Sequence, residues 1–237
     1  MQQFFEFPVT SVHTFDSFVV CDGNAGALQF SRRIADPDDP ENLLYIHGPA
    51  GSGKTHLLKA IGRSMSANSN KPAPYLSFRE PVTADELCRR FAQVEALIVD
   101  DLQLMPDDGD LRAALWQAFN DFHSSDRKIV MAGLHAPRDL PFLDDHLVSR
   151  LLWGLVARVD VSDDHSRRMI LKKIAGDRQV RIPDDVVDFI LMTTSREAGD
   201  LIFAFESVFR LSMALKRRIT LPLAREAREM QLSGASP

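Results

Sequence analysis

Apolar runs alternate with stretches of helical periodicity along the first 161 residues of the chain. Five of the runs have the length and the aliphatic content of buried strands, and they cover residues 43–47, 74–78, 96–101, 128–133 and 155–161. Strands that are apolar on both faces and separated by helices are typical of a parallel sheet with helices on both sides. The pattern therefore predicts an α/β fold.

The predicted helices differ in the strength of their signals. The clearest follows the third run, where one stripe holds the apolar side chains Leu111, Leu115, Ala118, Phe119 and Phe122, with Trp116 at its border. A shorter helix is predicted after the second run, because Thr83 and Glu86 have the spacing of a capping box.

Beyond residue 161 the strand-like runs largely stop. Helical periodicity then covers residues 167–177, 184–193 and 200–216. Residues 219–222 suggest a short extended piece before a last helix from Leu223. A small helical domain is therefore expected behind the sheet.

The most informative motif is the glycine-rich phosphate loop at residues 48–55. It consists of Gly48, Pro49, Ala50, Gly51, Ser52, Gly53, Lys54 and Thr55. The glycines let backbone N–H groups approach a phosphate, Lys54 reaches the β- and γ-phosphates, and the Thr55 hydroxyl binds Mg²⁺. A predicted strand precedes the loop and a predicted helix follows it, as the motif requires. We predict a site for ATP or ADP with Mg²⁺, and include His56, the next residue, in it.

Two acids end the third apolar run. An acid at the carboxyl end of a parallel strand beside a phosphate loop can hold Mg²⁺ through water, and Asp100 takes that role. Asp101 points elsewhere and is the candidate to polarise an attacking water. The alternative for both acids is a solvated turn, and the preceding phosphate loop favours metal binding.

Composition and charge limit the classes of function. The chain is 45% apolar and 26% charged, which is ordinary for a soluble globular protein. A net charge of −5 and a pI near 5.8 exclude a global basic field for nucleic acid or membranes. Cys21 and Cys88 lack metal-ligand spacing and suit a reducing compartment. With neither a basic signal-peptide region nor a membrane-length apolar run, we expect a cytoplasmic protein without membrane contact.

Taken in order, these motifs resemble the AAA+ region of the DnaA/Hda family of bacterial replication proteins. The matching stretches are residues 14–20 with Asn24, 48–58, 98–103, 147–155 and 219–221. The resemblance implies a P-loop AAA+ fold: a five-stranded parallel sheet flanked by helices, followed by a small helical lid. It divides the chain into an N-terminal peptide at 1–12, a nucleotide-binding α/β domain at 13–161 and a lid domain at 162–237.

The resemblance also implies roles for residues outside the phosphate loop. Phe18, Val19 and Val20 match the segment that flanks the adenine, although an N-terminal strand packed in the core remains an equal alternative. Arg150 matches the arginine finger that reaches the γ-phosphate of a neighbouring subunit. Its alternative is an ion pair with Asp144 or Asp145.

Two positions depart from the family pattern. The first sensor, usually polar, is Leu134, and His135 replaces it only with a one-residue shift. The second sensor, usually arginine, is Gly199, with Arg196 three residues earlier. Because both groups normally act on the γ-phosphate, we expect ATP hydrolysis by this chain to be weak or dependent on a partner.

The first residues resemble a peptide that docks on the replication sliding clamp. Gln2, Phe5 and Phe7 are the expected anchors, and Glu6 makes the match imperfect. The alternative is burial of these phenylalanines in the protein's own core or at an oligomer interface.

Within the family, the chain most resembles the Hda branch, which lacks the DNA-binding domain of DnaA. It implies a nucleotide-binding regulator of replication initiation that docks on the clamp and promotes ATP hydrolysis by DnaA. Self-association is a further option, and sequence-specific binding of duplex DNA is not expected because no helix-turn-helix module follows the lid. The alternatives are a stand-alone AAA+ ATPase that loads a helicase or remodels replication complexes and, more distantly, a P-loop kinase.

Overall fold

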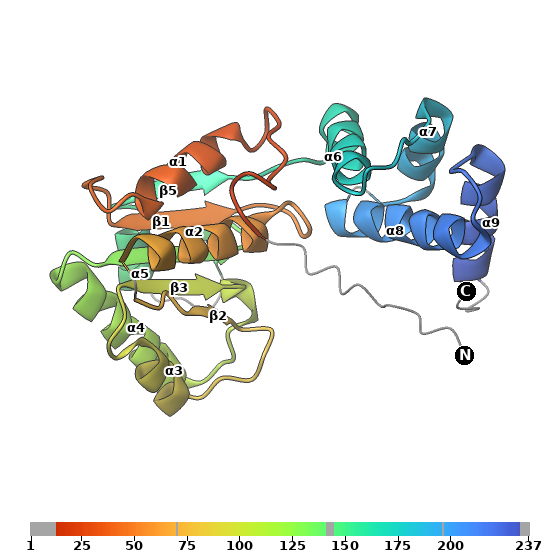
Figure 1. Ribbon diagram of the computed structural model, residues 1–237. Helices are drawn as coiled ribbons and strands as arrows, with labels where there is room; N and C mark the ends of the chain where they lie inside the picture. Colours follow the sequence, from red (N-terminus) through yellow and green to blue (C-terminus); the bar gives the residue numbers. More distant parts are fainter. Residues whose placement is uncertain (1–12, 70, 141–144, 196, 233–237) are drawn as a thin grey trace, which may run out of the picture.

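The computed structural model describes residues 13–69, 71–140, 145–195 and 197–232 (Figure 1). The predicted anchors Gln2, Phe5 and Phe7 lie outside this part, as do Asp144 and Arg196. The five strands are β1 (Leu43–His47), β2 (Tyr75–Ser77), β3 (Ala96–Asp100), β4 (Lys128–Gly133) and β5 (Leu155–Arg158). They form one sheet in the order β2-β3-β4-β1-β5, and all neighbours are parallel. The predicted fold class is confirmed.

Helices cover both faces of the sheet (Figure 1). They are α1 (Ala25–Ala35) and α2 (Lys54–Ser69) on one face, with α3 (Ala84–Phe91), α4 (Gly109–Ser124) and α5 (Asp145–Leu151) on the other. Alternate strand residues face opposite cores: Tyr45 packs with α3 and α4, whereas Leu44 and Ile46 pack with α1 and α2. This explains why the strands are continuous apolar runs in the sequence.

The predicted element ends hold with small differences. Thr83 caps α3, accepting a hydrogen bond from the Glu86 amide at 3.2 Å. β3 ends one residue early because Asp101 has a left-handed backbone with φ 57°. Residues 13–24 contain no strand, so the alternative of an N-terminal strand is wrong. Helix α1, which begins at Ala25, was not predicted.

The last four helices pack around a core of their own: α6 (Asp164–Asp177), α7 (Asp184–Thr193), α8 (Ala198–Leu215) and α9 (Leu221–Leu232). The expected extended piece at 219–222 is partly wrong, because α9 begins at Leu221. Pro222 then sits in its first turn, where a missing N–H leaves no hydrogen bond broken. Within the described ranges, the structure holds no helix that is long and apolar enough to cross a membrane.

Gly154, at the turn from α5 into β5, lies directly against β1. A β-carbon at this position would be 2.4 Å from the Leu43 carbonyl oxygen and 2.5 Å from Leu43 Cγ. We expect Gly154→Ala to lower the free energy of unfolding by about 2 kcal/mol or more, because backbone on both sides must move.

Urea denaturation of the two proteins measures this effect. Gly26→Ala on α1 is the matched control, because no heavy atom lies within 4 Å of its added carbon. We expect it to be neutral or to stabilise by up to about 1 kcal/mol. Equal midpoints for both variants would contradict the packing of the turn on β1.

Candidate nucleotide-binding site

The phosphate loop connects the end of β1 to the start of α2. Gly51 has φ +70°, and a β-carbon there would be 2.9 Å from the backbone nitrogen of Gly199. A β-carbon on Gly48 would be 2.0 Å from the Val159 carbonyl oxygen. The backbone at Val159, just after β5, and at the start of α8 thus lies directly against the loop. Only glycine, which has no β-carbon, permits so close an approach.

Lys54 lies inside the phosphate loop. Its side chain is buried, and Nζ donates hydrogen bonds to the carbonyl oxygens of Gly48 at 2.8 Å and Pro49 at 2.7 Å. Burial lowers the pKa of Lys54, and the charges of Asp100 and Asp101 oppose that shift. The loop therefore holds an ammonium group among its own backbone dipoles, where a phosphate would compete for it.

Asp100 and Thr55 lie side by side, as the sequence predicts. The Thr55 hydroxyl donates to Asp100 Oδ2 at 2.6 Å, and the Tyr75 hydroxyl donates to the same oxygen at 2.8 Å. Asp100 is fully buried. The pKa of Tyr75 is raised, first by the burial of its own hydroxyl and then by the nearby charge of Asp100. Hydroxyl and carboxylate oxygens at the foot of a phosphate loop fit the ligand preference of Mg²⁺.

Asp101 turns away from Thr55 and is held by three other side chains. Its Oδ2 accepts from Ser77 Oγ at 2.8 Å and Arg79 Nε at 2.9 Å, and its Oδ1 accepts from Gln103 at 3.2 Å. These three hydrogen bonds occupy both of its carboxylate oxygens. This arrangement disfavours Asp101 as a general base.

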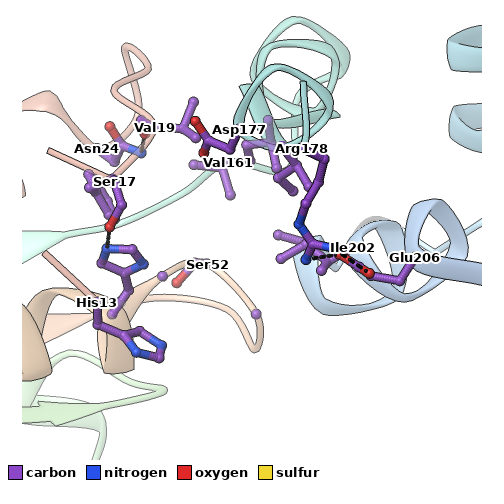
Figure 2. Close-up of a pocket in the computed structure, with 17 residues that line it drawn as sticks. His13, Ser17, Val19, Asn24, Ser52, Val161, Asp177, Arg178, Ile202 and Glu206 are labelled. Atoms are coloured by element: carbon purple, nitrogen blue, oxygen red, sulfur yellow. Dashed lines mark hydrogen bonds and ion pairs between the residues drawn. The ribbon is translucent and has the colours of Figure 1, made fainter. Parts of the chain in front are cut away.

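A cavity of about 520 Å³ lies between the phosphate loop and the lid (Figure 2). Its walls come from the N-terminal segment, the loop and the lid helices α6 and α8, and include Phe18, Val19, Gly51, Ser52, Gly53, His56, Ile170 and Ile202. Val20, also predicted for the site, is 45% exposed and does not line the cavity. Phe18 both lines the cavity and packs in the core beside α1 and α2.

His56 joins the N-terminal segment to the phosphate-loop helix. Its Nε2 donates to the Thr14 carbonyl oxygen at 2.9 Å and lies 3.3 Å from Ser17 Oγ. The Phe18 ring meets it edge-on at 5.3 Å. Asn24 holds the same segment, donating to the Val19 carbonyl oxygen at 2.9 Å. The end of the cavity at the N-terminal segment is therefore lined by apolar side chains and held in shape by hydrogen bonds. Such a surface suits a purine ring.

Comparisons with known proteins identify the family of this chain. The family model of the bacterial DnaA ATPase domain matches residues 9–158, more than half of the chain. The chain belongs to the bacterial DnaA ATPase-domain family. A second family model, the lid domain of Hda, matches residues 164–227. The chain is therefore a DnaA-related AAA+ replication protein, and its family membership supports nucleotide binding.

Solved structures of DnaA have the same fold. Domain III of DnaA from Thermotoga maritima is 26% identical and superposes with a TM-score of 0.79, covering 93% of this chain and 97% of that one. AMPPCP-bound DnaA from Aquifex aeolicus is 22% identical with a TM-score of 0.72, over 84% of this chain and 65% of that one. The RuvB Holliday junction branch migration motor of Thermotoga maritima is 18% identical, with a TM-score of 0.71 over 92% and 72%.

Leu134 and Gly199, which the sequence resemblance aligns with the two sensor positions, carry no charged or polar side chain. The backbone N–H of Leu134 donates to Gln103 Oε1 at 3.0 Å, so Gln103 links Asp101 to the end of β4. His135 is exposed, and its carbonyl oxygen accepts from Tyr45. Gly199 lies against Gly51 at the start of α8. Gln103 is a polar group that sequence reasoning left without a role, although it ends one of the family stretches.

The lid adds an ion pair to the cavity wall that the sequence did not predict (Figure 2). Arg178 Nη1 lies 3.1 Å from Glu206 Oε2, and both side chains are 19% exposed. Arg178 follows the end of α6, and Glu206 lies on α8. Because they are 28 positions apart in the sequence, no local pattern identifies the pair. They place one cation and one anion where the lid faces the cavity.

Arg150 lies far from the phosphate loop of its own DnaA-family domain. It belongs to α5, which Figure 1 places at the end of the sheet away from the loop between β1 and α2. Gly154, just beyond it, contacts Leu43 at the start of β1, whereas the loop follows the end of that strand. The alternative ion pair with Asp144 or Asp145 involves side chains outside the described ones.

The partly buried His56 predicts a stability that depends on pH. Burial lowers the pKa of His56 from 6.5, so the folded state binds fewer protons than the unfolded state once the pH falls below that value. The free energy of unfolding should therefore decline from pH 6.5 downward, and His56→Gln should reduce that decline. Denaturant midpoints at pH 7.5 and 5.5 measure it. The exposed His165→Gln is the control, and an equal decline in all three proteins would contradict the prediction.

Proposed function

We propose that this protein is a nucleotide-gated regulator of chromosomal replication initiation. In this proposal it binds ADP or ATP in the cavity, docks on the sliding clamp through Gln2, Phe5 and Phe7, and presents Arg150 to ATP-bound DnaA. Hydrolysis then takes place on the DnaA nucleotide. The observation that carries the proposal is the placement of Arg150 at the far end of the sheet from its own phosphate loop.

The chain's own nucleotide acts as a structural ligand in this proposal. Leu134 and Gly199 offer no side chain to a γ-phosphate, and Arg79 holds Asp101. Thr55 and Asp100 are the proposed Mg²⁺ ligands, where the ion would offset phosphate charge. The lid closes on the loop through Gly51 and Gly199, so a bound nucleotide would set how the lid sits on the sheet.

The test is a steady-state assay of ATP hydrolysis by DnaA with clamp loaded on DNA. We expect the full chain to raise the rate and a chain lacking residues 1–7 to need a much higher concentration for the same rate. Pull-down with purified clamp supplies the control for the peptide. Retention of the shortened chain on the clamp would overturn the docking peptide, and an unchanged DnaA rate with the full chain would overturn the regulatory function.

The stand-alone ATPase is the second candidate, because Asp100 ends β3 beside Thr55 of the phosphate loop and Asp101 follows it. It predicts rapid ATP turnover by the isolated chain that Asp101→Asn abolishes. The pairing of Asp101 with Arg79 argues against it. Turnover of the isolated chain at saturating ATP therefore separates the two candidates.

A further inference from the structure

The described contacts of Arg150 are all with uncharged side chains. Its Cζ lies 4.6 Å from the centroid of the Trp116 ring and 5.4 Å from that of Trp153. Its Nη1 donates a hydrogen bond to Asn120 Oδ1. Aromatic faces and an amide oxygen attract a guanidinium without neutralising it. Within the described part of the chain, these groups hold the Arg150 side chain in place without a carboxylate partner.

The groups on one side of Arg150 are fixed by α4. Trp116 and Asn120 are four residues apart, so they project from the same face of that helix. The Trp116 ring stacks on Phe119 with 6.3 Å between centroids, and Phe119 is fully buried in the core. This side of the site is therefore anchored to the sheet and does not depend on a partner.

The other side is fixed by the turn after α5. The backbone N–H of Trp153 donates to the Arg150 carbonyl oxygen at 3.0 Å, and the Trp153 ring meets the His123 ring edge-on at 5.6 Å. Gly154 pins the turn against β1. Trp153 is nevertheless 63% exposed, so the site opens to solvent on this side.

A cage of this kind suits an arginine that must meet an anion from outside. The guanidinium has five N–H donors, and its described hydrogen bond to Asn120 leaves most of them for phosphate oxygens. A carboxylate partner would have to be displaced first, whereas π faces stay in place when the donors bind an anion. Holding the long side chain beforehand also reduces the entropy lost on binding.

We propose that Trp116, Asn120 and Trp153 form a neutral cage that pre-orients Arg150 for the terminal phosphate of a nucleotide on the partner. They are positioning residues, because they act through Arg150 and do not touch the nucleotide. The inference rests on the proposed function, which assigns Arg150 to the partner's nucleotide.

The decisive variant is Asn120→Asp, which replaces the amide that accepts the hydrogen bond of Arg150 Nη1 by a carboxylate of almost the same shape. We expect the maximal stimulation of DnaA hydrolysis to fall about tenfold, because an ion pair must now be broken. The midpoint of thermal unfolding should stay equal or rise. A merely structural role predicts that activity falls only together with stability.

The aromatic faces are tested in parallel. Trp116→Leu should lower maximal stimulation, and Trp116→Phe, which keeps a ring, should restore most of it. Rates are taken at saturating protein, so that weaker docking is separated from poorer positioning. If Asn120→Asp and Trp116→Leu both stay within twofold of the parent while Arg150→Ala is inactive, the cage is overturned and the proposed function stands.

A second measurement tests the cage without any partner. The chain has two tryptophans, and both lie at Arg150, so 5-fluorotryptophan labelling gives two ¹⁹F resonances that report on the cage. We expect both resonances to shift in Arg150→Ala. Two unshifted resonances would overturn the cage. Full stimulation by Arg150→Ala would instead overturn the proposed function and the role of the cage with it.

Discussion

Lys54→Ala should weaken the affinity for ADP and ATP by about 100-fold, or ~2.7 kcal/mol. The Lys54 ammonium lies buried in the phosphate loop on the carbonyl oxygens of Gly48 and Pro49. A phosphate oxygen would add a charge-assisted bond to this group, in a site where burial weakens screening. Without the ammonium, the negative charges of Asp100 and Asp101 face the phosphates directly.

Titration calorimetry with ADP and with ATP in the presence of Mg²⁺ measures this loss. Lys59→Ala is the matched control, since Lys59 lies on the same helix with its Nζ over the Tyr75 ring and outside the loop. We expect the control to bind within about threefold of the parent chain. An affinity of Lys54→Ala within the same range would show that the loop does not bind phosphate.

Arg150→Ala should abolish the stimulation of DnaA hydrolysis, because an arginine supplied in trans is worth about 1,000-fold or more in rate. The reason is geometric, because α5, which holds Arg150, lies at the end of the sheet away from its own phosphate loop (Figure 1). Nucleotide binding by the variant should be unchanged. Arg150→Lys should recover little, because an ammonium lacks the planar fork that two phosphate oxygens require.

The assay uses ATP-bound DnaA with clamp on DNA, and compares maximal rates. Arg89→Ala is the control for loss of one surface charge, since Arg89 lies on α3 and is bonded to the Asp85 carbonyl oxygen of its own helix. It should stimulate like the parent chain. Persistent stimulation by Arg150→Ala would overturn the assignment.

Much of the fold could be predicted because its signals are local. Strands covered on both faces appear as apolar runs, and the capping box at Thr83 and Glu86 specifies a helix start within four residues. The phosphate loop is equally local, because one strand, one turn and one helix build it. Helix α1 was missed, and α9 begins two residues earlier than predicted, because proline is tolerated in the first turn of a helix.

The sequence by itself determined the succession of strands and helices along the chain, the phosphate loop, and the acid Asp100 at the end of the third strand. Each of these depends on residues that are close together in the chain. Only the tertiary structure decided what surrounds them. It brought Arg178 to Glu206, Gly199 to Gly51, and the two tryptophans to Arg150. Such contacts join segments that are far apart in the sequence. They depend on how the elements pack in three dimensions, and local sequence patterns carry no information about that packing.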